Sequence, residues 1–162
     1  MGILAGIDGV LCKLQEQKPA IFPNFSDDAT LFAASDYSGQ HSTASHEAYS
    51  FVFTTPRRWQ SWERHRLEVR GTFLLTRRIS FKTLEDRKRS EALPAFLAAA
   101  KALEGLTVTI LVNKTLRSLF SSSGTLNLKR PELARVSGWK PAVVERLLRV
   151  THLMALFIAG LS

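Results

Sequence analysis

ATLFAASDYSGQHSTASHEAYSFVFTT, residues 29–55, is the stretch that indicates the fold most clearly. Its first part, ATLFAASDY, is a short apolar run that ends in the polar turn SDYSGQHS. The last part, AYSFVFTT, alternates apolar and polar residues, which is typical of a half-buried strand. Gly, Ser and His between two such runs are loop residues. The stretch therefore predicts two strands joined by a polar loop.

The segments on the C-terminal side predict a mixture of helices and strands. In chain order they are a helix over 56–69, a third strand over 71–84, a helix over 84–105, a strand over 106–113, a helix over 114–122 and an apolar helix over 141–162. Pro56 suits the first turn of its helix. Pro94 lies inside the next one, so that helix is expected to begin near Ser90. The β-branched run LTVTILVN at 106–113 is typical of a strand buried on both faces.

The length of 162 residues corresponds to one domain with appendages. We expect an N-terminal arm over 1–28 with a short helix over 3–16, because prolines and a Ser-Asp-Asp turn interrupt the rest of it. The core is expected over 29–122. A loop and the apolar helix form the C-terminal part, 123–162.

Composition favours a globular protein of a reducing compartment. The chain is 45% hydrophobic and 22% charged, and no segment has the ~18 uninterrupted apolar residues of a membrane span. The apolar N-terminus has no basic region and contains Asp8, which argues against a signal peptide. Cys12 is the single cysteine and cannot form an internal disulfide. A cytoplasmic location without membrane contact is therefore predicted.

The positive charge is concentrated in one segment. Residues 57–89 hold eleven Lys or Arg and four acids, and so carry +7 of the chain's net +8. Such focusing attracts phosphate polyanions, although a solvated charged face is the simpler alternative. Trp59 and Trp62 lie among the arginines, where they either stack on bases or form the buried stripe of a helix.

The order of elements, with Asp36 at the end of the first strand, resembles the ribonuclease H-like superfamily. The motif SDYSG is similar to the Asp-Glu-Ser-Gly-type opening of an uncharacterised bacterial branch of that superfamily. The resemblance covers about 29–122. It implies an α+β or α/β fold, in which three antiparallel strands and a parallel fourth form a mixed sheet with flanking helices. The fourth strand, 106–113, is then expected beside the first.

The resemblance also implies a metal site. Asp36 matches the Asp of the first strand, Glu91 matches the Glu of the following helix, and Asn113 stands where the family places a second Asp. Carboxylates and amide oxygens suit Mg²⁺ or Mn²⁺, and two such ions catalyse phosphodiester hydrolysis. Asp36 and Glu91 are therefore predicted as catalytic residues, and Asp36, Glu91 and Asn113 as metal ligands. As alternatives, Asp36 caps its own turn and Glu91 interacts with the helix dipole.

The predicted function is a metal-dependent phosphodiester hydrolase, or nuclease, that acts on nucleic acid. Seven basic residues are expected to contact the phosphate backbone: Arg57, Arg58, Arg64, Arg66, Arg77, Arg78 and Lys82. The alternative is a non-catalytic module of the same fold that binds nucleic acid or a protein partner. The chain contains no phosphate-binding G-x-x-x-x-G-K loop, no G-x-G-x-x-G and no G-x-S-x-G motif.

The C-terminal helix is apolar nearly all round from Val150 onward. A helix of this kind is buried on most of its circumference. We therefore expect a further surface to cover it, either downstream chain that carries the family's fifth strand and last helix, or a protein partner.

Overall fold

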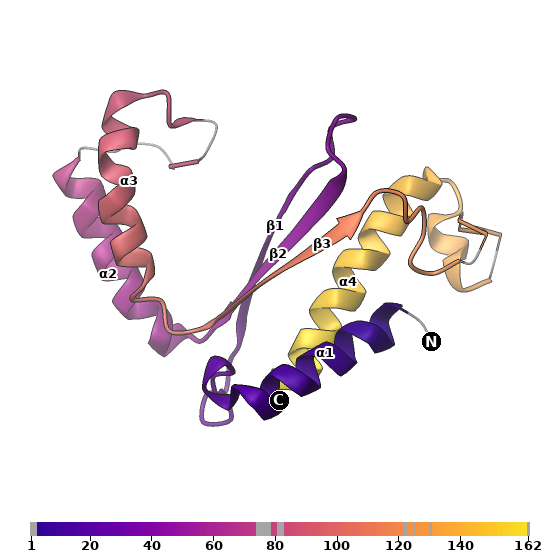
Figure 1. Cartoon of the computed structure of the whole chain (residues 1–162), viewed down its shortest axis with the longest axis horizontal. Coiled ribbons are helices and arrows are strands. Elements are labelled where there is room, and N and C mark those ends of the chain that lie inside the picture. Colours follow the sequence, from indigo (N-terminus) through magenta and orange to yellow (C-terminus); the bar gives the residue numbers. More distant parts are fainter. Residues whose placement is uncertain are drawn as a thin grey trace. The chain divides into compact units, whose positions relative to one another are not determined.

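The computed structural model describes residues 3–73, 79–80, 83–121, 123–124, 126–129 and 131–161, with side chains from residue 6 on. Its elements are helix α1 (Ile3–Gln17), the 3₁₀ turn η1 (Pro19–Ile21), strands β1 (Phe32–Ser38) and β2 (His46–Thr54), helices α2 (Pro56–Thr72) and α3 (Arg87–Ala100), strand β3 (Leu106–Asn113), the 3₁₀ turn η3 (Pro131–Val136) and helix α4 (Pro141–Leu161) (Figure 1). This mixture of helices with one sheet confirms the α+β class.

The strands form an antiparallel sheet in the order β1-β2-β3, with β2 in the middle (Figure 1). Tyr49, Phe51 and Phe53 alternate along β2 and are all fully buried, as expected for one face of a strand. Gly39 begins the β1–β2 loop with a φ of +78°, and a Cβ there would lie 2.1 Å from the carbonyl oxygen of His46. Only glycine fits this backbone conformation without strain.

The predicted pairing of 106–113 with the first strand is wrong, because β2 lies between β1 and β3. The strand itself is confirmed to the residue. Its predicted burial on both faces is also wrong, since alternate residues are exposed and Leu111 is 66% exposed. The alternation shows that one face of β3 is covered and the other is exposed. Half of the third strand predicted over 71–84 falls on 74–78 and 81–82, which lie outside the described residues, and its first two residues belong to helix α2 instead.

The chain divides into two compact units. The first unit consists of Met1–Asn24, Ala34–Phe51 and Thr107–Ser162, and the second of Phe25–Ala33 and Val52–Leu106. The strands therefore run through both. In place of the helix predicted over 114–122, residues 114–121 form turns and irregular structure.

In the second unit, α2 and α3 lie side by side (Figure 1). Thr55 caps α2 by accepting a bond from the backbone N–H of Arg58, and Pro56 occupies the first turn. Trp62 of α2 is buried and meets Phe96 of α3 edge to face, with 5.2 Å between ring centroids. This contact fills the space between the two helices.

In the first unit, α4 buries one stripe of residues. Val144, Leu153 and Phe157 are buried, and the Phe157 ring lies 5.7 Å from that of Phe51 on β2. Val143 and Ile158 remain exposed, so their cover by a further surface stays a prediction. None of the helices in the described ranges is long and apolar enough to span a membrane.

Candidate nucleic-acid interface

The three predicted metal ligands occupy different elements. Asp36 is exposed on β1, and Asn113 is the exposed last residue of β3. Strands separated by one intervening strand lie about 10 Å apart. The amide oxygen of Asn113 already accepts a bond from the backbone N–H of Thr115, at 2.9 Å.

Glu91 lies on α3, in the second unit, whereas Asp36 and Asn113 belong to the first. Its carboxylate accepts a bond from Nε of Arg87 at 2.7 Å, one turn earlier on the same helix. Among the residues that the structure describes, no group of three or more His, Cys, Asp and Glu is placed to hold a metal ion. The combined site of Asp36, Glu91 and Asn113 stays a prediction.

The predicted arginines of α2 divide into two kinds. The guanidinium of Arg58 lies over the Phe25 ring, 4.9 Å from its centroid, and also pairs with Asp28. Arg66 donates two bonds to Glu63, and this contact lowers the pKa of Glu63. Arg58 connects α2 to the segment before β1, whereas Arg66 pairs within α2. These contacts reduce the availability of both side chains to a ligand.

Arg57 and Arg64 are the exposed pair. The Arg57 side chain is 70% exposed and reaches Asp28 at 3.5 Å, and Arg64 is also exposed. Seven residues apart, they share one side of α2, about 10 Å apart along its axis. Trp62 points the other way, into the space between α2 and α3, and is buried. It therefore belongs to the buried stripe of the helix and is not placed to stack on bases. Arg77, Arg78 and Lys82 lie outside the described residues.

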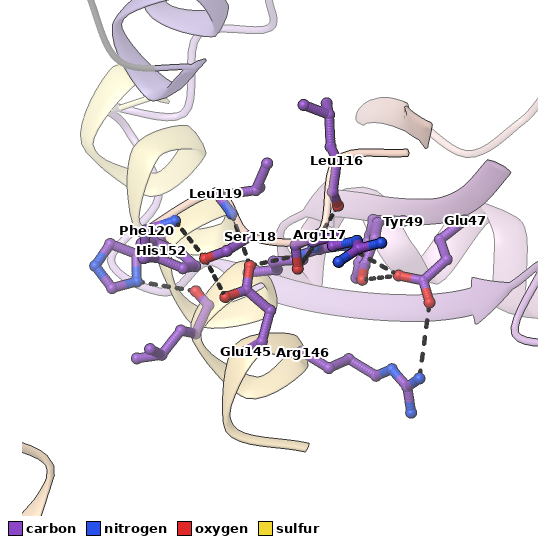
Figure 2. A network of polar contacts seen from close by, with 12 residues as sticks. Glu47, Tyr49, Leu116, Arg117, Ser118, Leu119, Phe120, Glu145, Arg146 and His152 are labelled. Carbon is purple, nitrogen blue, oxygen red and sulfur yellow. Dashed lines mark hydrogen bonds and ion pairs between the residues drawn. The ribbon is translucent and has the colours of Figure 1, made fainter. Parts of the chain in front are cut away.

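A buried polar network in the first unit was missed at the sequence level (Figure 2). Arg149 of α4 donates to Glu145 at 2.9 Å, to Glu47 of β2 at 3.2 Å and to the carbonyl oxygens of Leu116 and Arg117 at 3.2 and 3.4 Å. Burial opposes its charge, but the bonds with Glu145 and Tyr49 outweigh burial and raise the pKa of Arg149. The available signal was a Glu and an Arg four residues apart, in line with the apolar residues of a largely apolar helix.

The two carboxylates of the network are fully engaged. Glu145 also accepts from the Ser118 hydroxyl at 2.7 Å and from the Leu119 backbone N–H at 2.8 Å (Figure 2). Glu47 accepts from the Tyr49 hydroxyl at 2.6 Å. Burial and this bond raise the pKa of Tyr49 to about 12. The network thus connects the segment after β3 to helix α4 and to β2, the middle strand of the sheet.

Comparison of the chain with protein-family models, with curated proteins and with solved structures gave no match.

Proposed function

We propose that this chain is a nucleic-acid-binding module that contacts backbone phosphates through α2. The observation that carries the proposal is the placement of Arg57 and Arg64 on one exposed side of that helix, away from the buried Trp62. These two cations belong to the segment 57–89, which holds +7 of the net +8. Arginine forks bind phosphate oxygens at fixed geometry. An intracellular, cytoplasmic location, suggested by the lone Cys12, is part of this proposal.

The salt dependence of binding tests it. Fluorescence anisotropy of a labelled single strand and of a labelled duplex is measured between 50 and 200 mM salt, about the range in which phosphate contacts lose most affinity. The slope of log K against log salt is negative, and the double variant Arg57→Gln, Arg64→Gln should make it shallower by about 1.4–1.8. Each lost phosphate contact removes roughly 0.7–0.9 from its magnitude.

The matched control is Arg135→Gln with Lys140→Gln, two exposed cations of the first unit. It removes the same charge and should leave the slope within error of the unchanged protein. The proposal fails if both double variants change the slope equally, because the effect is then one of net charge alone.

The metal-dependent phosphodiesterase of ribonuclease H-like type is a second candidate. The observation that favours it is Asp36, an exposed carboxylate held on a strand, which is a rigid mount for a metal ligand. The test is cleavage of a labelled strand with Mg²⁺ or Mn²⁺ by the unchanged chain, by Asp36→Asn and by Glu91→Gln. Cleavage that both variants abolish supports the candidate. Cleavage that survives Asp36→Asn excludes this site.

A further inference from the structure

A small cavity of about 240 Å³ lies beside the buried network of the first unit. Its lining includes Glu47 of β2, Lys114 and Arg117 of the segment after β3, and Glu145, Arg146 and Arg149 of α4. All six belong to the first unit. The volume is below the ~300–1,000 Å³ of pockets for drug-sized ligands, so the cavity suits a small group.

The cavity has an excess of positive charge. Four cations line it against two carboxylates, which leaves a formal charge of +2. The carboxylates are neutralised from within, because Arg149 bonds both of them and Arg146 lies 3.7 Å from Glu47. The two remaining positive charges are those of Lys114 and Arg117, and these two cations frame the cavity together with Arg146.

These three cations keep hydrogen-bond donors for a ligand. Nζ of Lys114 gives one bond to the carbonyl oxygen of His41, and an ammonium group has three donors. Arg146 contacts Glu47 through one terminal nitrogen only. Within the described residues no acceptor is bonded to the guanidinium of Arg117, which is exposed.

The backbone that presents Arg117 is held in place. Arg149 donates to the carbonyl oxygens of Leu116 and Arg117. Gly124 has a φ of +76°, and a Cβ there would lie 3.4 Å from Cβ and 3.5 Å from Cδ of Arg117. The chain thus packs against the stem of Arg117 from one side while the network fixes its backbone from the other. Such preorganisation lowers the entropy cost of binding.

We infer that this cavity binds a phosphate monoester group through Lys114, Arg117 and Arg146. A phosphate monoester carries about −1.5 to −2 charges at pH 7, which matches the excess of +2 in the cavity. Its tetrahedral oxygens match arginine forks and an ammonium donor. Free phosphate and the 5′-phosphate of a nucleic-acid strand share this chemistry.

The first measurement is calorimetric titration of the full chain with inorganic phosphate, at constant ionic strength maintained with chloride. Arg117→Gln should weaken phosphate binding at least tenfold, and Arg146→Gln, which keeps the buried Arg149 contacts, should weaken it as well. The control Arg135→Gln removes an exposed cation of η3 and should change the dissociation constant less than twofold. Binding equal in Arg117→Gln and in the unchanged chain would overturn the inference, as would chloride acting as well as phosphate.

The second measurement separates the two sources of phosphate. Oligonucleotides with a 5′-phosphate and with a 5′-hydroxyl are compared, each with and without inorganic phosphate as competitor. A preference for the 5′-phosphate that competitor and Arg117→Gln both remove identifies a strand end as the ligand. Equal binding of the two oligonucleotides, with phosphate still bound in calorimetry, assigns the cavity to a free or small-molecule monoester. The α2 variants Arg57→Gln and Arg64→Gln should leave the titration with inorganic phosphate unchanged. A failure of the proposed α2 contacts is therefore distinguishable from a failure of the cavity to bind phosphate.

Discussion

Nε of Arg149 lies 2.9 Å from Oε1 of Glu145, and the two side chains are 7% and 9% exposed. The same spacing of four residues occurs on α3, where Arg87 and Glu91 are 2.7 Å apart with side chains 91% and 52% exposed. The order of the residues is reversed, since the acid comes first on α4 and the base comes first on α3. The two ion pairs thus share a spacing but lie in opposite environments. Within the described part of the chain, the α4 pair alone continues into further hydrogen bonds, to β2 and to the segment after β3.

Replacement of Arg149 by Met should lower the free energy of unfolding by about 3–5 kcal/mol, because Glu145 is left buried without its cation. The control Arg87→Met breaks the exposed pair and should cost less than about 0.5 kcal/mol. Urea unfolding followed by circular dichroism measures both. Equal, small losses in the two variants would show that the α4 network is not a structural anchor.

Tyr49 should titrate well above a free tyrosine, since burial and its bond to Glu47 raise its pKa to about 12. The chain has two tyrosines, so Tyr37→Phe leaves Tyr49 as the single phenol that absorbs near 295 nm on ionisation. Titration of that variant should show the transition near pH 12. A transition near pH 10 would contradict a buried, hydrogen-bonded hydroxyl.

The same shift predicts how stability depends on pH. Between the unfolded pKa near 10 and the folded pKa of about 12, the folded chain holds the Tyr49 proton more tightly than the unfolded chain does. The contribution of Tyr49 is therefore complete below pH 10 and is lost as the pH rises toward 12. Tyr49→Phe should remove this part of the alkaline loss in urea unfolding.

Gly39→Ala should destabilise the β1–β2 hairpin. The added Cβ meets the carbonyl oxygen of His46 at 2.1 Å, and a φ of +78° costs a non-glycine residue roughly 1–2 kcal/mol before that clash is relieved. The matched control is Gly71→Ala in α2, where nothing lies within 4 Å of the new Cβ. That change should stabilise the helix by about 0.5–1 kcal/mol. Thermal unfolding of both variants checks the opposite signs.

Several elements follow from local chemistry and were predicted well from the sequence. Leu106–Asn113 is a strand because β-branched residues favour the extended backbone. The helix predicted over 56–69 is α2, which continues through Gly71 to Thr72. Asp86 caps α3 by accepting a bond from the backbone N–H of Arg89, so the helix begins at Arg87, three residues before Ser90.

What the sequence pattern predicted poorly depends on contacts between distant residues. Whether β3 pairs with β1 or β2 is set by long-range pairing, which periodicity does not report. The apolar run of β3 predicted two covered faces, yet only one face is covered, because the number of layers packed on a sheet depends on distant parts of the chain. A helix was predicted over 114–122, but the carbonyl groups of Leu116 and Arg117 bond to Arg149 and the N–H of Leu119 bonds to Glu145 instead.

The strand order sets a sequence of events in folding. Seven residues separate β1 from β2, whereas 51 separate β2 from β3. For a flexible chain the longer closure costs about 2 kcal/mol more in entropy, so the hairpin forms first and β3 docks late. Until it docks, one edge of β2, with Phe51 and Phe53 on its covered face, is open to pairing with other chains. The interval before β3 arrives is thus when a newly made chain is most exposed to aggregation, and when a chaperone would protect it most.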